Sequence, residues 1–561
     1  MAWLLDDFAF LSVLLKAATL AFEAFVIGGL LYIALIAIPA GPAAQPVLSR
    51  CRSGIRRAAM MLAITELLFV AVDSAILMGT VGLSVREILR ADYFLAGTGA
   101  MLASLVLFLI LEGAAARIAS IAKFLLFSLP FIAVLAAASV WTSHSISRLD
   151  DRLVTGLLTG LHQLAVAAWI GAMPFLLISI PAVSEKETAR FMARRFSSLA
   201  MVCVAVLISA GIALSYFYVG SVPALYGTAY GFMILTKSAL LLVLLALGGT
   251  NWWLVRSLDC QAWDRSGVAS SKPLETSTQP LLFLRRIGEA ELGIGFSIIL
   301  AAASLTSQPP AIDLVQDRLT ATEIVERYHP IVPRFTTPSV DQLSPATPLE
   351  ESIHSYDMSA VAKAHNQDPD IAWSEYSHHW AGLILLGIGA GAWLAARFPR
   401  FGWARHWPLG FVALAIFSFL RGDPENWPFG PISFWKSFYD PEVALHRIYD
   451  VLIASYGLFE WGVQTGRLQS RKAAYVFPVI MALGGAGLLL HTHALGNVKN
   501  ELLIEMTHNT LGVLAVIAGW ARFVEVRLPM GQGGRVSRIA AQVWPACLLF
   551  IGFMLLNYRE A

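Results

Sequence analysis

Long apolar runs, separated by shorter polar segments, account for most of the chain. A transmembrane helix needs about 20 mainly apolar residues to cross roughly 30 Å of hydrocarbon. Eight suitable runs precede a long polar break and six follow it, near residues 8–38, 56–79, 93–112, 121–143, 153–180, 195–219, 230–255 and 287–306, and then 379–397, 406–421, 445–463, 474–491, 504–524 and 540–557. The pattern predicts an all-α fold, a polytopic integral membrane bundle of about 14 transmembrane helices.

Positively charged residues mark every second loop between these runs. The loop after the first run carries Arg50, Arg52, Arg56 and Arg57, and clusters of Lys and Arg recur in alternate loops to the end of the chain. Loops rich in Lys and Arg stay on the cytoplasmic side of a membrane. We therefore expect a multi-pass protein of the bacterial inner membrane with both termini in the periplasm.

A Pro-rich segment separates the two sets of runs. It contains eight prolines between Pro309 and Pro369 and few aromatic residues, a composition that does not build a large core. The sequence therefore predicts three parts. These are an eight-helix membrane domain at 1–311, a Pro-rich periplasmic loop at 312–377 and a six-helix, His-rich membrane domain at 378–561.

The composition agrees with a membrane protein and argues against a nucleic-acid partner, a disulfide framework and a thiolate metal site. Hydrophobic residues make up 57% of the chain and charged residues 14%, against roughly 25% charged in an average soluble protein. A net charge of +2 gives no reason to expect a nucleic-acid partner, so the expected surroundings are the lipid bilayer. The four scattered cysteines encode neither a disulfide framework nor a thiolate metal site.

Histidines gather at one end of the second set of helices. Six of the twelve lie at ends that face the periplasm in this topology: His378, His379, His446, His491, His493 and His508. Imidazole binds copper, zinc and haem iron, so the pattern predicts a transition-metal site, although helix capping or headgroup contacts remain an alternative. With one histidine of the first half and one thioether added, the expected ligands are His162, His379, His446, His491, His493, His508 and Met506.

Ionisable residues inside the apolar runs are the second signal. Each is costly in hydrocarbon unless it is paired or hydrated, so such residues often line a pathway for ions or substrates. The candidates for a translocation pathway are Glu23, Glu66, Asp73, Lys237 and Glu291. Interhelical ion pairs are the structural alternative.

Three stretches of the first half resemble the CopD family of copper-resistance membrane proteins. They are the segment from His162 to Pro174, the segment from Tyr230 through Lys237 to Asn251, and the segment from Leu284 to Ala311 with Glu289 and Glu291. The positions of His162, Trp169, Lys237 and Glu291 match the family. Where the family typically has Trp-x-Gly-Gly, this chain has Trp169-Ile170-Gly171-Ala172. The resemblance implies copper handling between periplasm and cytoplasm, often beside a periplasmic CopC-like copper carrier.

Three functions fit these observations. The first is a membrane protein that moves or hands over copper ions, and no phosphate-binding loop is present to drive it with ATP. The second is a b-type cytochrome with haem b held by histidines from the set His379, His446, His493 and His508, or a copper-dependent membrane redox protein. The third is a copper delivery or assembly factor. The sequence favours a transporter or metal-binding protein over an enzyme, and an enzyme here would be a membrane oxidoreductase.

Overall fold

The computed structural model describes residues 8–115, 120–147, 151–264, 279–316, 318–338, 368–398, 400–439, 441–490, 499–528 and 534–560. Over these ranges the chain is helical and contains no strand, which confirms the all-α prediction for the described residues. The chain divides into two compact units. Unit 1 comprises Met1–Arg318 and Leu489–Asn497, and unit 2 comprises Leu319–Leu488 and Val498–Ala561.

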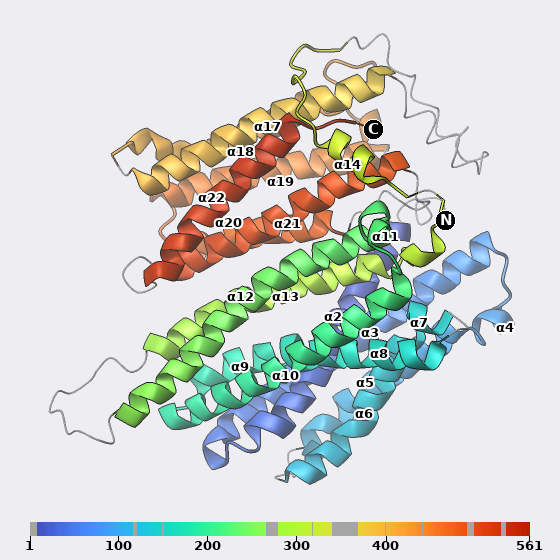
Figure 1. The fold of residues 1–561 in the computed structure, drawn as a ribbon, viewed down its shortest axis with the longest axis vertical. Coiled ribbons are helices and arrows are strands. Elements are labelled where there is room, and N and C mark those ends of the chain that lie inside the picture. The colour runs from blue at the N-terminus through green and yellow to red at the C-terminus, as the bar shows by residue number, and fades with distance from the viewer. Residues whose placement is uncertain are drawn as a thin grey trace. The chain divides into compact units, whose positions relative to one another are not determined.

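Unit 1 is built from helices, most of which are long (Figure 1). They are α2 (Phe8–Tyr32), α3 (Gln45–Thr80), α4 (Val85–Ile88), α5 (Asp92–Ala115), α6 (Ile121–Trp141), α7 (His144–Ser147), α8 (Arg152–Val166), α9 (Met173–Ser179), α10 (Lys186–Tyr218), α11 (Val222–Gly227), α12 (Ala229–Asp264) and α13 (Gln279–Leu305). Two π-helical turns continue helices without a break: η1 (Ile33–Ala37) follows α2, and η3 (Ala167–Gly171) joins α8 to α9.

Three segments form the interior of unit 1. About two thirds or more of the apolar stretch is buried in Leu11–Ala37, Arg152–Ala182 and Leu281–Leu305, whereas the other spans of this unit are less than one third buried. The exposed faces of those outer spans carry Leu, Val and Ile side chains, as expected of helices surrounded by lipid. The interior segments are therefore the ones that position polar side chains inside the unit.

A close crossing of α2 and η3 holds this interior together. A methyl group at Gly28 would overlap the backbone of Ala167 and Gly171, and one at Gly171 would overlap the backbone of Ala24. Glycine is required at both positions because only hydrogen fits between the two backbones. Small residues at helix crossings are typical of membrane bundles, where close packing replaces the hydrophobic effect between helices.

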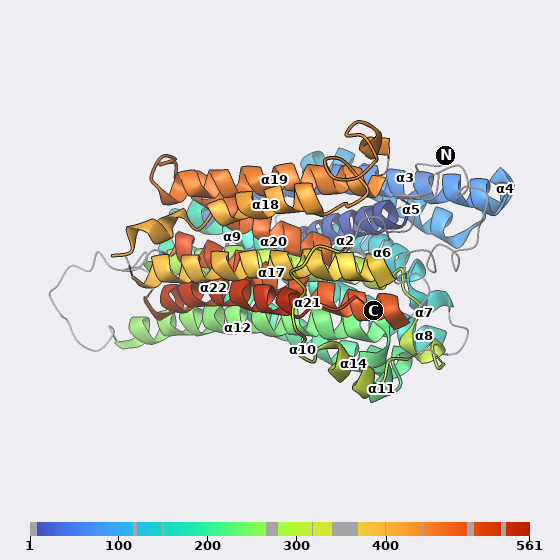
Figure 2. The same ribbon diagram turned by 90° about the horizontal axis from the view of Figure 1, so that it is seen from above.

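Unit 2 contains α14 (Ala321–Arg327), α17 (Asp368–Arg397), α18 (Leu409–Arg421), α19 (Pro441–Gln464), α20 (Val476–Leu488), α21 (Lys499–Arg527) and α22 (Gly534–Leu556). Within it, α17 lies beside α22, α18 beside α19, and α20 beside α21 (Figures 1 and 2). Its core is aromatic: Tyr456 stacks on Phe477 with ring centroids 4.6 Å apart, and Trp407, Phe411 and Trp544 pack around them.

Eleven helical segments among the described residues are long and apolar enough to span a membrane, eight in unit 1 and three in unit 2. The chain is thus a multi-pass membrane protein, and the eight runs predicted in the first half are confirmed as helices. The three other predicted runs also coincide with helices. However, α18 and α20 have 13 residues each, about 20 Å of helix, and α19 carries several ionisable residues. The count of fourteen spans and the orientation of the termini therefore stay predictions.

Candidate functional site

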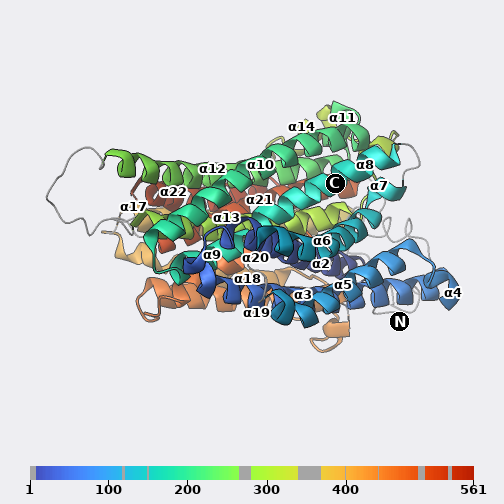
Figure 3. The same ribbon diagram turned by 90° about the horizontal axis from the view of Figure 1, so that it is seen from below.

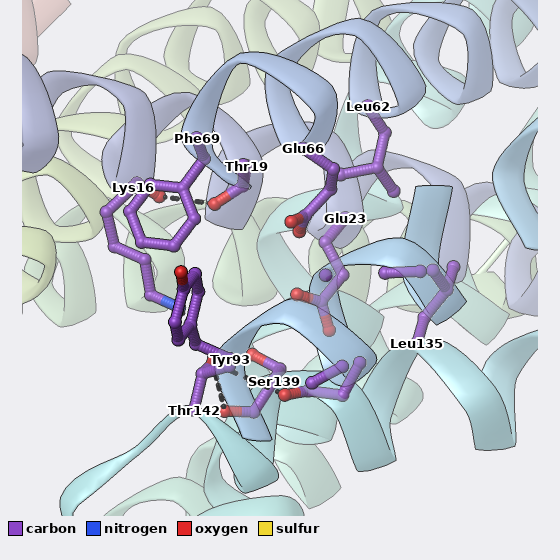
Figure 4. A pocket seen from close by; sticks show the side chains of 14 residues that line it. Lys16, Thr19, Glu23, Leu62, Glu66, Phe69, Tyr93, Leu135, Ser139 and Thr142 are labelled. Atoms are coloured by element: carbon purple, nitrogen blue, oxygen red, sulfur yellow. Dashed lines mark hydrogen bonds between the residues drawn. The ribbon is translucent and has the colours of Figure 1, made fainter. Parts of the chain in front are cut away.

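Helices α2, α3, α5 and α6 lie side by side in unit 1 (Figure 3). A small polar cavity lies between them (Figure 4). Its volume is about 10 Å³, enough for one water molecule. Its polar lining consists of Lys16, Thr19 and Glu23 from α2, Glu66 from α3, Tyr93 from α5, and Ser139 and Thr142 from α6. The structure therefore brings two of the predicted pathway acids, Glu23 and Glu66, to one place.

Lys16 and the two acids occupy opposite ends of this cavity (Figure 4). The Lys16 ammonium group donates to Thr142 Oγ1 at 2.9 Å and lies 5.5 Å from the centroid of the Phe69 ring. Glu23 is hydrogen-bonded to Ser139, and Glu66 is close enough to Glu23 for their charges to interact. One cation thus faces two neighbouring carboxyl groups in a region that otherwise excludes charge.

Asp73 lies on α3 two turns beyond Glu66. Its Oδ1 atom is buried, and no group in the described part of the chain hydrogen-bonds to it. The charge of Lys16 acts on Asp73 as well as on Glu23 and Glu66. Three acidic groups therefore depend on one lysine, and they are too numerous to be explained as a single ion pair.

A second polar site occupies the middle of unit 1, around Glu291 of α13. This side chain is 4% exposed. Trp169 Nε1 donates to Glu291 Oε1 at 3.3 Å and Asn251 Nδ2 donates to Glu291 Oε2 at 2.7 Å. Gly248 lies beside this carboxyl group, and a Cβ there would be in ordinary van der Waals contact with Glu291 Oε1 at 3.4 Å. The sequence singled out Trp169 and Glu291 but not the donor role of Asn251, whose signal is an amide inside the apolar run 230–255.

A larger cavity of about 430 Å³ adjoins Glu291. Residues of η3, α9, α10, α12 and α13 line it, and apart from Glu291, Asn251 and Ser197 they are apolar, aromatic or glycine. Its walls include the indole rings of Trp169 and Trp252 and the thioethers of Met173 and Met201. This cavity has the size and lining of a small-molecule site.

His162 belongs to α8 and lies close to α10 and α12. It hydrogen-bonds to the backbone of Leu207, and a Cβ at Gly211 would lie 3.4 Å from its ring. Its Nδ1 atom is buried, with no hydrogen-bond partner within the ranges that the structure describes. The charge of Lys237 acts on this imidazole, so a metal cation at His162 would be repelled by Lys237 unless the lysine were neutral.

His379 in unit 2 has a structural role in this conformation. Its Nδ1 atom accepts a hydrogen bond from the Arg334 N–H at 2.8 Å, and its Nε2–H donates to the Tyr558 carbonyl at 2.9 Å. The side chain is fully buried. Since both ring nitrogens serve the backbone, His379 has none left for copper or haem iron.

His378 and His508 lie together instead, with ring centroids 6.3 Å apart. Each directs Nδ1–H to the carbonyl oxygen four residues earlier, at 2.8 Å for Ser374 and 3.1 Å for Ile504. The Tyr558 ring stacks on His378 at 3.9 Å. The sequence left the choice between His378 and His379 open, and the geometry favours His378 because its Nδ1–H bond leaves the Nε2 lone pair for a ligand.

His446 and Met506 are the other predicted ligands of unit 2 that the structure describes. His446 is 45% exposed and pairs with Asp423 at 2.9 Å, and Met506 is buried. His491 and His493 lie outside the described residues. Among the residues that are described, no group of three or more His, Cys, Asp or Glu side chains could hold a metal ion.

An ion pair ties α14 to α21 outside the membrane-spanning segments. Lys499 Nζ donates to Glu323 Oε1 at 2.8 Å, and Glu323 also caps the start of α14 by accepting from Thr320. The bond from Lys499, followed by those from Thr320, lowers the pKa of Glu323 to about 2. The carboxylate therefore stays charged throughout the physiological range.

Comparison with known proteins finds that part of this bundle is similar to a family of copper-resistance proteins. Residues 190–305, which include Lys237, Asn251 and Glu291, match the family model CopD, copper resistance protein D. The resemblance to CopD is therefore confirmed over this segment. The chain is also similar to the copper transport protein CutJ of Bacillus subtilis, with 26% identity over 192 residues, which is 34% of this chain and 31% of that protein. The chain thus spans less than a third of that relative's length, and no solved structure matches it significantly.

Proposed function

We propose that this protein moves copper ions across the bacterial inner membrane, or hands them over there, with its histidine-rich end in the periplasm. Copper is the cargo in this proposal and not a resident cofactor. The CopD match and the printed name of the similar protein, a copper transport protein, support the choice of metal.

The observation that carries the proposal is the set of ionisable side chains inside unit 1. Interior helices of a membrane protein gain nothing from isolated carboxylates, and such groups usually mark the path of an ion or proton. Glu23, Glu66 and Asp73 would offset the charge of a cation near Lys16, and Glu291 with Lys237 and His162 would act deeper in the unit. Because the polar cavity holds about one water, an ion would exchange its hydration shell for these side chains.

The histidines predicted at the periplasmic end of the second set of helices would collect the metal before it reaches this path. We assign this role to His446, His491, His493 and His508 with Met506, and we place His378 in the set where the sequence had His379. Imidazole and thioether groups suit Cu(I), and imidazole also suits Cu(II). A periplasmic CopC-like carrier is the partner that we expect to deliver the ion.

Copper uptake into proteoliposomes that contain the full chain tests the proposal. We expect uptake to fall at least tenfold in Glu66→Gln and in Glu23→Gln, because a neutral amide keeps the shape of the carboxyl group but cannot offset a cation's charge. Glu187→Gln is the matched control, since Glu187 is 82% exposed on α10. Two results would exclude this path. One is copper uptake by protein-free liposomes equal to that of the proteoliposomes, and the other is uptake by the two pocket variants equal to that of the control.

Metal analysis of the purified protein, beside a reduced-minus-oxidised visible spectrum, separates cargo from cofactor. Copper that binds and is released on exchange, with no Soret band, supports transport or delivery. A Soret band with stoichiometric iron would replace the proposal with a b-type cytochrome.

A further inference from the structure

The 430 Å³ cavity beside Glu291 opens to the side of unit 1. Met201 of α10 and Trp252 of α12 line it, and these side chains are 53% and 37% exposed. Both belong to spans of the membrane protein. The mouth between α10 and α12 therefore faces hydrocarbon, and an occupant would enter from the bilayer.

The cavity extends over about half of the apolar thickness of a membrane. On α12 its lining residues run from Leu245 to Val255, a separation of ten residues that covers about 15 Å of helix. The hydrocarbon core of a bilayer is roughly 30 Å thick, so the cavity has about the depth of one leaflet. This depth fits the acyl chain of a lipid that enters from one side of the membrane.

The polar groups in the wall need nothing from an occupant. Both oxygens of Glu291 already accept hydrogen bonds, one from Trp169 Nε1 and one from Asn251 Nδ2. The Oδ1 atom of Asn251 is buried away from the open space. Apart from these two residues and Ser197, the lining is apolar, aromatic or glycine. An alkyl chain is therefore the occupant that matches the interior of the cavity.

Arginine residues continue two walls of the cavity at one end. Arg194 lies on α10 seven residues before Met201, and the position directly before this arginine lines the cavity. Arg256 lies on α12 four residues after Trp252, and the position before it also lines the cavity. Residues at these spacings share one face of a helix. Both arginines are exposed, and the Arg256 guanidinium group lies 5.1 Å from the centroid of the Trp252 ring.

These two arginines restrict the chemical class of the occupant. A guanidinium group presents a planar fork of donors that matches the geometry of a phosphate group. Both residues flank predicted apolar runs, 195–219 and 230–255, at the ends that the alternation of charge assigns to the cytoplasm. Basic pockets between helices on that side bind the headgroups of anionic lipids. The apolar cavity and its basic end thus match one molecule that carries both a phosphate group and a long alkyl chain.

We propose that this cavity binds an anionic phospholipid, with one acyl chain between α10 and α12 and the phosphate group at Arg194 and Arg256. A zwitterionic lipid fits less well, because its choline group adds a positive charge beside two guanidinium groups. Free inorganic phosphate fits less well because it has no chain to fill the cavity. The proposal concerns lipid binding alone and does not depend on copper transport.

A pair of lipids that differ only in their headgroups tests this site. The full chain is delipidated in detergent and titrated with dioleoyl phosphatidylglycerol and with dioleoyl phosphatidylcholine, and native mass spectrometry measures the bound lipid. We expect phosphatidylglycerol to bind at least about tenfold more tightly, because two basic residues contribute to its binding. Equal affinities would overturn the proposal and show a cleft that accepts any lipid.

Charge variants locate the headgroup. The double variant Arg194→Gln/Arg256→Gln should bind phosphatidylglycerol at least about tenfold more weakly and phosphatidylcholine as before. Arg50→Gln/Arg57→Gln is the matched control, because it removes two exposed arginines of α3, a helix that contributes no residue to the cavity wall. An equal loss in both double variants would show a general effect of net charge and refute the assignment.

Cavity-filling variants locate the acyl chain. Gly249 lines the cavity, and a Cβ there would meet nothing within 4 Å in the described structure, so Gly249→Leu projects into the open space. Gly99→Leu on α5 is the matched control, because its Cβ is equally unhindered and it does not line the cavity. We expect at least about tenfold weaker binding of phosphatidylglycerol in Gly249→Leu and unchanged binding in Gly99→Leu.

A second filling variant, Ala200→Phe on the facing helix α10, guards against a folding defect in Gly249→Leu, since Ala200 also lines the cavity. Size-exclusion chromatography of each variant identifies folded protein before titration. Undiminished binding of phosphatidylglycerol in a folded filling variant would place the acyl chain elsewhere and refute the proposal, even if the arginine variants bound it weakly.

Discussion

Replacing Gly28 with alanine tests whether the crossing of α2 and η3 limits the stability of unit 1. The added methyl group would lie well inside 3.0 Å of the Ala167 and Gly171 backbone, and backbone atoms cannot move aside as a flexible side chain does. The two segments must separate by about 1 Å, which removes a quarter to a half of the attraction between facing atoms. Overpacking of this kind costs up to about 3 kcal/mol.

A gain in helix propensity opposes this cost. Alanine is more favourable than glycine in a helix by about 1 kcal/mol, so the expected net loss for Gly28→Ala is about 2 kcal/mol. The control Gly99→Ala has the same gain and no neighbour within 4 Å among the described residues. It should therefore be more stable than the wild type by up to about 1 kcal/mol.

Reversible unfolding in mixed detergent and SDS, followed by circular dichroism, measures both variants. The predicted difference between them is about 3 kcal/mol. If Gly28→Ala were as stable as Gly99→Ala, the two backbones would not be in contact as described, and the packing argument for the interior of unit 1 would fail.

Three further changes have defined outcomes. Arg522→Met should cost about 3–5 kcal/mol in the same unfolding assay, because it leaves Glu460, which is 1% exposed and bonded to Arg522, without its cation. Trp169→Phe should lower the free energy of unfolding by about 1–2 kcal/mol, because the buried carboxyl group of Glu291 loses a hydrogen-bond donor. Trp253→Phe, at an exposed tryptophan, is the control, and an equally small loss in both variants would contradict this prediction. Lys499→Met should raise the pKa of Glu323 from about 2 toward its ordinary value of 4.5. The wild type is then more stable than this variant above about pH 4.5, and this difference in stability disappears as the pH falls toward 2. A difference in stability that does not change with pH would refute the prediction.

Hydrophobic patterning predicted the helices of unit 1 well. Every backbone group in hydrocarbon must bond within its own helix, so each of the eight runs had only one available structure. The three remaining runs of the second half, 406–421, 445–463 and 474–491, were also helical. Whether these three helices span the membrane depends on their length and on ionisable residues such as Asp450. Hydrophobic patterning alone does not decide it.

The candidate site was predictable in its residue types but not in its contacts. The sequence identified Glu23, Glu66 and Glu291 as buried ionisable residues, since charge inside an apolar run is conspicuous. It did not reveal that Asn251 donates to Glu291, because that contact joins α12 to α13 across forty residues. Nor did spacing decide between His378 and His379: neighbouring helical positions point about 100° apart, and only the packing of the Arg334 and Tyr558 backbone shows which ring is engaged.

The π-helical turn at Ala167–Gly171 has a consequence for the natural variation of this protein. Such a turn holds one residue more than an α-helix needs to cover the same distance. Deleting a single residue there would restore a regular helix and rotate everything before it, His162 included, by about 100° relative to α9. We therefore expect insertions and deletions to be rare at this turn in functional variants, even though the helix itself would tolerate one. Where an alignment of related chains does show a one-residue gap here, a changed partner for Trp169 should accompany it.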